Sequence, residues 1–202
     1  MKLYHSPTSP YVRKVVVLLR EMGKLDAVEM VSAGGTPLDA GTLPLSQNPL
    51  GKIPALERAD GPALYDSRVI TRYLDTVLKG GMYPEPPRLW ETLTLEATAD
   101  GILDAAILMV YEKRLRPEGM QFVDWEEAQW GKVARALDTV ESRWMAYLSG
   151  PLDAGQIALG CALGYVDFRL GARNWRAGRT NLAGWAETFM ARESMVATVP
   201  QG

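Results

Sequence analysis

Cysteine and histidine are nearly absent from this chain. Its 202 residues contain one cysteine, Cys161, and one histidine, His5. A single cysteine excludes an internal disulfide and a CxxC redox pair. With so few sulfur and imidazole ligands, we expect no metal site. His5, at the end of a strand pattern, has no carboxylate placed by sequence to orient it, and we assign it no role.

Long apolar runs and an excess of one charge are also missing. The first apolar run, residues 15–19, lies between Lys14 and Arg20. It is too short for a signal-peptide core or a membrane span. The 22 basic and 24 acidic residues give a formal net charge of -2, so no basic footprint favours nucleic acid or an anionic membrane. We therefore expect a cytoplasmic protein without either partner.

What the chain does contain is enough apolar sequence for a sizeable core, since 47% of its residues are hydrophobic. Its first 78 residues alternate short strand patterns with helical ones. The predicted elements are a strand at 2–5, a helix through Val12 and Leu19, a strand at 27–31, a loop with room for one short helix at 32–52, a hairpin of 53–57 and 62–65, and a helix at 69–77.

A break in composition follows at Gly80-Gly81 and the prolines after it. Every later segment has a helical pattern, so we predict a first domain at 1–78, a linker at 79–87 and an all-helical domain at 88–202. Within the helical part, Asp124 and Glu127 resemble a capping box. The apolar segment 157–166 predicts a helix at the centre of a bundle, and Asp153 is expected to cap it by accepting from the N–H of Gln156.

Three short segments carry polar groups at places suited to a ligand. In the first, Ser9 and Pro10 stand at a strand-to-helix turn, either as a plain helix cap or as a site where free N–H groups favour an anion or thiolate. In the second, Pro54 opens a strand after Ile53, where a cis bond would turn the Ile53 backbone outward. In the third, a carboxylate and a hydroxyl, Asp66 and Ser67, begin a helix, either as a plain capping arrangement or as a receptor for an amino acid.

Together these segments, SPTSPYVRKV, NPLGKIPAL and YDSRVITRYL, resemble the glutathione transferase family. The resemblance continues in ADGILDA, YEKRLRP and LGCALGYVDFRL and so covers most of the chain. It implies an α/β thioredoxin-like N-terminal domain followed by an all-α helical-bundle C-terminal domain. It also implies a cis Ile53-Pro54 bond and a homodimer that pairs through residues 88–148.

The resemblance further implies roles for single residues. Ser9, with Thr8 as the alternative, would donate a hydrogen bond to the glutathione sulfur and favour its thiolate. The residues implied to hold the rest of the tripeptide are Lys52 near the glycyl carboxylate, Ile53 with Pro54 at the cysteinyl backbone, and Asp66 with Ser67 at the γ-glutamyl end. The residues offered for the second-substrate pocket are Met109, Tyr111 and Arg114, although Met and aromatic residues at helical spacing are more often core.

The function implied is that of a detoxifying enzyme, a glutathione transferase. It would add glutathione thiolate to a small hydrophobic electrophile or use it to reduce an organic hydroperoxide, with glutathione as cosubstrate and no cofactor. Transfer is favoured over disulfide exchange because Ser9 cannot form a mixed disulfide. A non-catalytic adaptor or ligand-binding protein of the same fold is the alternative. We also expect Arg13 and Lys14 on a solvated helix face, and Cys161 buried and unreactive.

Overall fold

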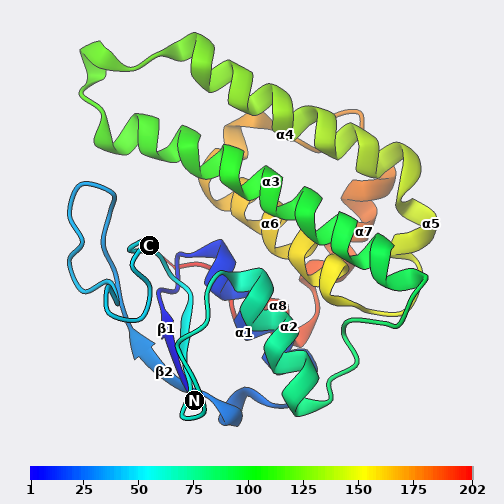
Figure 1. The fold of residues 1–202 in the computed structure, drawn as a ribbon. Coiled ribbons are helices and arrows are strands. Elements are labelled where there is room, and N and C mark those ends of the chain that lie inside the picture. The colour runs from blue at the N-terminus through cyan, green and yellow to red at the C-terminus, as the bar shows by residue number, and fades with distance from the viewer. Residues whose placement is uncertain (202) are drawn as a thin grey trace.

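A computed structural model describes residues 1–201 and shows a small sheet with helices beside a larger layer of helices (Figure 1). The first part contains β1 (Lys2–His5), α1 (Pro10–Glu21), η1 (Leu25–Ala27), β2 (Glu29–Ser32), β3 (Ala55–Glu57) and α2 (Ser67–Leu78). The second part contains α3 (Arg88–Leu115), η2 (Glu118–Met120), α4 (Val123–Arg143), α5 (Met145–Leu148), α6 (Ala154–Leu170), η3 (Gly171–Arg173), α7 (Thr180–Met190) and α8 (Glu193–Val196).

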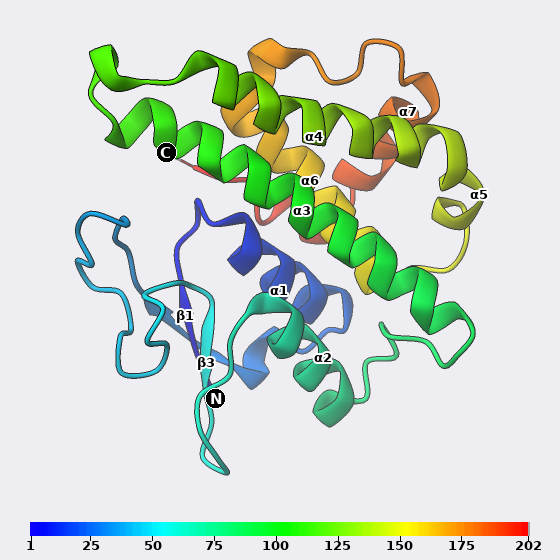
Figure 2. The ribbon, with the colours of Figure 1, turned by 45° about the horizontal axis from the view of Figure 1, so that its top comes forward.

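The sheet has the strand order β2-β1-β3, with β1 parallel to β2 and antiparallel to β3. Leu3, in the middle of the central strand, is opposite Met30 on one side and Leu56 on the other, and Leu3 and Leu56 are fully buried. Figure 2 shows α1 and α2 next to this sheet, with α3 running above them. This arrangement confirms the predicted thioredoxin-like domain followed by a helical one.

Three details of the predicted strands are wrong, and the first is that the strand predicted at 53–57 begins only at Ala55. The second strand begins two residues later than predicted, at Glu29, because residues 25–27 form a turn of 3-10 helix. The segment 62–65 forms a single bridge between Leu64 and Leu56 and not a full strand. Pro62 has no N–H to give to a ladder, and its carbonyl accepts from Arg58 Nε at 3.0 Å. Within 33–52, all of which is described, the chain forms turns and no helix.

The core crosses from one part of the chain to the other. Leu3 and Leu18 belong to the same buried cluster as Ile157, Cys161 and Met195 from the helical part. The centre of α6 is buried on all sides, as the apolar segment 157–166 predicted. An apolar contact of this kind holds two domains together. The helical part is therefore held in a defined position against the residues of the site described below. No helix among residues 1–201 has the length and apolar character needed to cross a bilayer.

Of the two predicted helix caps in the second part, one is confirmed. Asp153 accepts a 3.0 Å hydrogen bond from the backbone N–H of Gln156 at the start of α6. The capping box at Asp124 is wrong, because α4 begins one residue before it, after Phe122. The N–H of Phe122 donates to Glu112 Oε1 at 2.9 Å. A carboxylate from the end of α3 therefore supplies an acceptor that the local sequence was expected to provide.

Candidate active site

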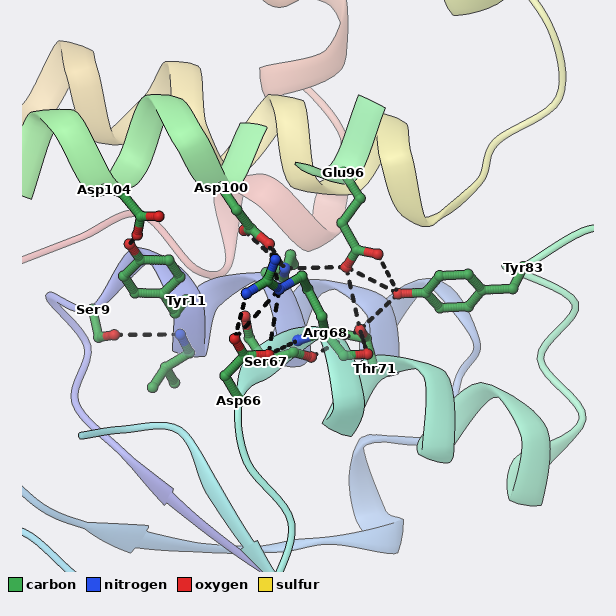
Figure 3. A network of polar contacts seen from close by, with 12 residues as sticks. Ser9, Tyr11, Asp66, Ser67, Arg68, Thr71, Tyr83, Glu96, Asp100 and Asp104 are labelled. Atoms are coloured by element: carbon green, nitrogen blue, oxygen red, sulfur yellow. Dashed lines mark hydrogen bonds and ion pairs between the residues drawn. The ribbon is translucent and has the colours of Figure 1, made fainter. Parts of the chain in front are cut away.

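The turn between β1 and α1 is built around Ser9. Its backbone N–H donates to Ser6 O at 3.2 Å, and its hydroxyl oxygen accepts from the N–H of Val12 at 3.3 Å (Figure 3). Pro10 follows at the first helical position, so both local predictions for this cap are confirmed. Since a hydroxyl has two acceptor lone pairs and one proton, the cap leaves the Ser9 proton free to be donated. The Thr8 hydroxyl lies 3.2 Å from that of Ser6.

The loop before β3 is shaped by a buried asparagine. Asn48 is 2% exposed, and its side-chain amide donates to the carbonyl of Lys52 at 2.9 Å. The predicted cis bond between Ile53 and Pro54 is confirmed. Within the described residues, the backbone N–H and C=O of Ile53 make no backbone hydrogen bond, which leaves both for a ligand. The Lys52 side chain is exposed.

Asp66 caps α2 and carries an ion pair as well. Its carboxylate accepts from the Arg68 backbone N–H at 3.0 Å and from Arg68 Nη2 at 2.8 Å. Partial burial favours the protonated acid, but the hydrogen bonds and charge of Arg68 outweigh it and lower the pKa of Asp66. Asp66 is therefore a carboxylate at neutral pH and can attract an ammonium group. Ser67, directly after it, is 2% exposed.

A buried ion cluster joins α1 to α3 behind these residues (Figure 3). The Lys14 ammonium lies 2.9 Å from Asp100 Oδ1 and 3.1 Å from Glu96 Oε1. Tyr83 OH donates to both oxygens of Glu96 at 3.0 Å. The predicted solvated face at residues 13 and 14 is wrong, because Arg13 is 5% and Lys14 1% exposed. The helical domain covers the face that was expected to meet water.

Two further contacts of α1 reach the second part of the chain. The Tyr11 hydroxyl donates to Asp104 Oδ1, and Arg13 donates to the carbonyl of Met195 at 2.9 Å and to Thr198 Oγ1 at 3.2 Å. These partners were missed by the sequence analysis. A usable signal was present in α3, where acidic residues recur every fourth position at 96, 100 and 104 and so share one helix face.

The three residues offered for the second-substrate pocket lie along the C-terminal part of α3. Met109 is 1% exposed, Tyr111 is half-buried and Arg114 is exposed. Burial raises the pKa of the Tyr165 hydroxyl on α6, with Arg169 and Arg114 acting in the opposite direction and Tyr111 in the same one. Tyr111, Arg114 and Arg169 therefore each lie close enough to the Tyr165 hydroxyl to affect its ionisation. The role of Met109, Tyr111 and Arg114 in a pocket stays a prediction.

Comparison with known proteins agrees with this arrangement. Family models for the N-terminal and C-terminal domains of glutathione S-transferase match residues 8–77 and 123–188. The uncharacterized GST-like protein YibF of Escherichia coli K12 is 34% identical over 204 residues, which cover 99% of this chain and 98% of YibF.

Two solved structures of a glutathione transferase family member from Pseudomonas fluorescens Pf-5 are also similar. One, with bound glutathione, has a TM-score of 0.95 and 41% identity and covers 100% of this chain and 99% of its own. The other, with bound S-(propanoic acid)-glutathione, has a TM-score of 0.91 and 42% identity and covers 100% of both chains. With domain matches in both halves and a relative of this identity over its full length, the chain belongs to the glutathione transferase family.

Proposed function

We propose that the protein is an active glutathione transferase and that Ser9 is its catalytic hydroxyl. The observation that carries this proposal is the state of the Ser9 side chain. It stands at the N-terminus of the 12-residue helix α1, uses a lone pair to cap the helix, and keeps its proton for a ligand. Thr8 is the weaker candidate, because its hydroxyl is already hydrogen-bonded to the hydroxyl of Ser6.

Glutathione would lie along the three segments around this turn. The free N–H and C=O of Ile53 suit the cysteinyl backbone, Asp66 with Ser67 suits the γ-glutamyl ammonium and carboxylate, and exposed Lys52 suits the glycyl carboxylate. The bound glutathione of the similar Pf-5 protein supports this assignment.

The stabilisation of the glutathione thiolate that Ser9 has to provide is small. An alkyl hydroxyl does not ionise near neutrality, so the nucleophile is the sulfur of glutathione, and Ser9 favours its thiolate by donating a hydrogen bond. Lowering a thiol pKa from about 8.5 by two units requires roughly 2.7 kcal/mol. One charge-assisted hydrogen bond together with the N-terminal dipole of α1 is sufficient for a stabilisation of that size.

The thiolate would attack a small electrophile or reduce an organic hydroperoxide. We favour conjugation, because the similar Pf-5 protein also holds glutathione with a propanoic acid on its sulfur. A site of the same shape in this chain would have room for a substituent beyond the sulfur.

We further propose a homodimer that pairs through residues 88–148. Large apolar side chains stay exposed in this stretch, with Trp90 62%, Phe122 61% and Val123 58% exposed. Trp90 is at the start of α3, whereas Phe122 and Val123 follow its far end, so it is the adjacent pair that favours an interface. Light scattering at micromolar concentration should give the mass of two chains, and a monomer would contradict the proposal.

The transferase proposal is tested with purified protein. It should be retained on immobilised glutathione and turn over 1-chloro-2,4-dinitrobenzene or cumene hydroperoxide. Retention without turnover on any class of electrophile or peroxide would favour the adaptor reading. No retention at all would contradict both readings of the site.

A further inference from the structure

Two arginines near the candidate site differ from their neighbours in lacking an acidic partner. At this end of the helical part, Lys113, Arg116, Arg173 and Arg176 are each paired with a carboxylate. Arg114 and Arg169 take part in none of the ion pairs found among residues 1–201. Arg169 packs against the Phe168 ring, with its guanidinium carbon 3.8 Å from the ring centroid. Neither guanidinium group is therefore neutralised by a carboxylate, although Arg169 also interacts with the Tyr165 hydroxyl.

The contacts of α1 show where these arginines lie. On α1, Lys14 contacts Asp100, and Tyr11, which is nearer the start of the helix, contacts Asp104. The contacts move backward along α1 and forward along α3, so the two helices are antiparallel. The next turns of α3, with Tyr111 about 10 Å beyond Asp104, pass the first residue of α1. Arg114 follows one turn later. The end of α3 therefore extends over the β1–α1 turn that carries Ser9 (Figure 2).

The helix α6 also passes close to the start of α1, next to the β1–α1 turn. Gly164 lies against Arg13, since a methyl group placed on it would be 2.5 Å from a guanidinium nitrogen of that residue. Tyr165 comes next and is close enough to Tyr11 to influence its pKa. Arg169 lies one turn further along, on the same face as Tyr165. Each of the two helices thus carries a phenol and an arginine to one side of the β1–α1 turn. On α3 these are Tyr111 and Arg114, and on α6 they are Tyr165 and Arg169.

The acidic groups nearby have hydrogen-bond partners other than these two arginines, although Asp104 keeps its charge because its partner is a neutral phenol. Asp104 accepts from Tyr11. Asp167 is held by Trp175 and Arg176, and Glu112 by Arg116 and the N–H of Phe122. Two cations beside phenols, neither of them in an ion pair among residues 1–201, form a receptor for an anion.

We propose that the second substrate is a small electrophile that carries a carboxylate, which Arg114 and Arg169 bind while the reacting carbon meets the sulfur beside Ser9. This proposal rests on the proposed transferase function and names the substrate class of that site. With an aryl chloride that carries a carboxylate, the sulfur–carbon bond forms and the carbon–chlorine bond breaks. Chloride leaves with the bonding pair, and the thiol proton goes to solvent.

A binding measurement tests the proposal without turnover. The probes are S-(2-carboxyethyl)glutathione and its uncharged amide, S-(2-carbamoylethyl)glutathione, compared by titration calorimetry. We expect the carboxylate conjugate to bind about tenfold more tightly, which is the size expected of a charge-assisted hydrogen bond. The preference should shrink as salt is added. It should disappear in the double variant Arg114→Gln/Arg169→Gln.

The control variant is Arg135→Gln, which removes one positive charge, against two in the double variant, from an exposed position on α4 and should keep the full preference. Equal binding of the two conjugates by the wild type would overturn the proposal. So would a preference that survives in the double variant. If neither conjugate nor glutathione binds, the proposed function itself fails and the substrate class falls with it.

A second arm compares turnover of 4-chloro-3-nitrobenzoate with that of its methyl ester. The wild type should favour the acid in kcat/KM, and the double variant should lose this preference while still converting the ester. An ester rate that falls by the same factor as the acid rate would show damage to the fold and not lost recognition, and would count against the proposal.

Discussion

The ammonium of Lys14 lies 2.9 Å and 3.0 Å from the two carboxylate oxygens of Asp100, although the two side chains are only 1% and 5% exposed. Glu96 shares the same ammonium. One buried cation thus compensates two buried carboxylates at the contact between the glutathione transferase domains.

Lys14→Met should therefore destabilise the protein strongly. Removing one partner of a buried ion pair costs about 3–5 kcal/mol, because Glu96 loses its cation and Asp100 keeps only the more exposed Arg68, at 3.5 Å. Denaturant unfolding at pH 7 measures the loss. Burial raises the pKa of Asp100 and Lys14 opposes that rise, so the variant should bind an extra proton when folded. Its deficit should then shrink as pH falls. Adding Glu96→Gln and Asp100→Asn should restore most of the stability, and a single variant as stable as the wild type would contradict the prediction.

Ser9→Ala should cut turnover with an electrophile by roughly ten- to a hundredfold below the thiol pKa, because a hydrogen bond to a charged group contributes about 1.5–3 kcal/mol. Glutathione affinity should change little, since in the proposed site Ser9 would contact only the sulfur. The loss should shrink as pH rises, because the thiolate then forms without help. A pH–rate profile measures this shift.

Two variants control the Ser9 experiment. Loss of the cap should also lower the stability of Ser9→Ala by about 1 kcal/mol, whereas Ser9→Thr keeps cap and proton and should stay active. If Thr8→Ala loses the rate and Ser9→Ala keeps it, the donor is the neighbouring residue.

Asp66→Asn should weaken glutathione binding without disturbing the start of α2. Asparagine caps helices as well as aspartate does, so the variant keeps the cap and removes the charge together with the ion pair to Arg68. We expect the KM for glutathione to rise about tenfold with kcat nearly unchanged. Because Arg68 lowers the pKa of Asp66, the wild-type affinity should persist to a pH below the usual carboxyl range. An unchanged KM would mean that Asp66 only caps the helix.

Glu21→Gln should reveal a pH-dependent contribution to stability. Glu21 accepts from two nitrogens of Arg192, each at 2.8 Å, and from the Ser194 hydroxyl. Hydrogen bonding to Arg192 lowers the pKa of Glu21 against the opposing effect of burial. Its contribution is therefore present above the ordinary glutamate pKa and is lost as pH falls through the folded value. Arg192 is 39% exposed, so solvent screening limits the loss to about 1 kcal/mol at pH 7. A loss that stays constant down to pH 2 would contradict this account.

Cys161 should resist thiol reagents in the folded protein. It is fully buried, and burial raises its pKa to about 11. At pH 8 only about a thousandth of the thiol is then ionised, and the thiolate is the reactive form. Titration with a chromogenic disulfide should show no reaction until denaturant is added. Rapid labelling of the native protein would refute the expected burial.

Local signals explain which features could be predicted from sequence. Ser9 before Pro10, and Asp153 three residues before Gln156, are caps that neighbouring residues specify, and both occur as expected. The strand and helix order of the first part follows from periodicity in the same way. The chemical roles at the site came from resemblance of whole segments and not from any single residue.

Contacts between distant segments explain what could not be predicted. Arg13 and Lys14 are charged residues on a helix, and only the acids of α3 and the carbonyl of Met195 make their burial tolerable. In α4 the expected capping box fails because Glu112 comes from the preceding helix to take the N–H of Phe122. The acidic residues at 96, 100 and 104 mark one face of α3 in the sequence, but nothing local to them names the distant residues that they meet.

The bond from Arg13 to the carbonyl of Met195 has a consequence for how the protein is made. Met195 packs in the same core as Leu3 and Leu18, so the sheet and its helices have no complete interior until nearly the whole chain has been synthesised. The first domain should therefore stay protease-sensitive on the ribosome for most of translation. Chains stalled before residue 195 should be digested near the β1–α1 turn, whereas released chains should resist.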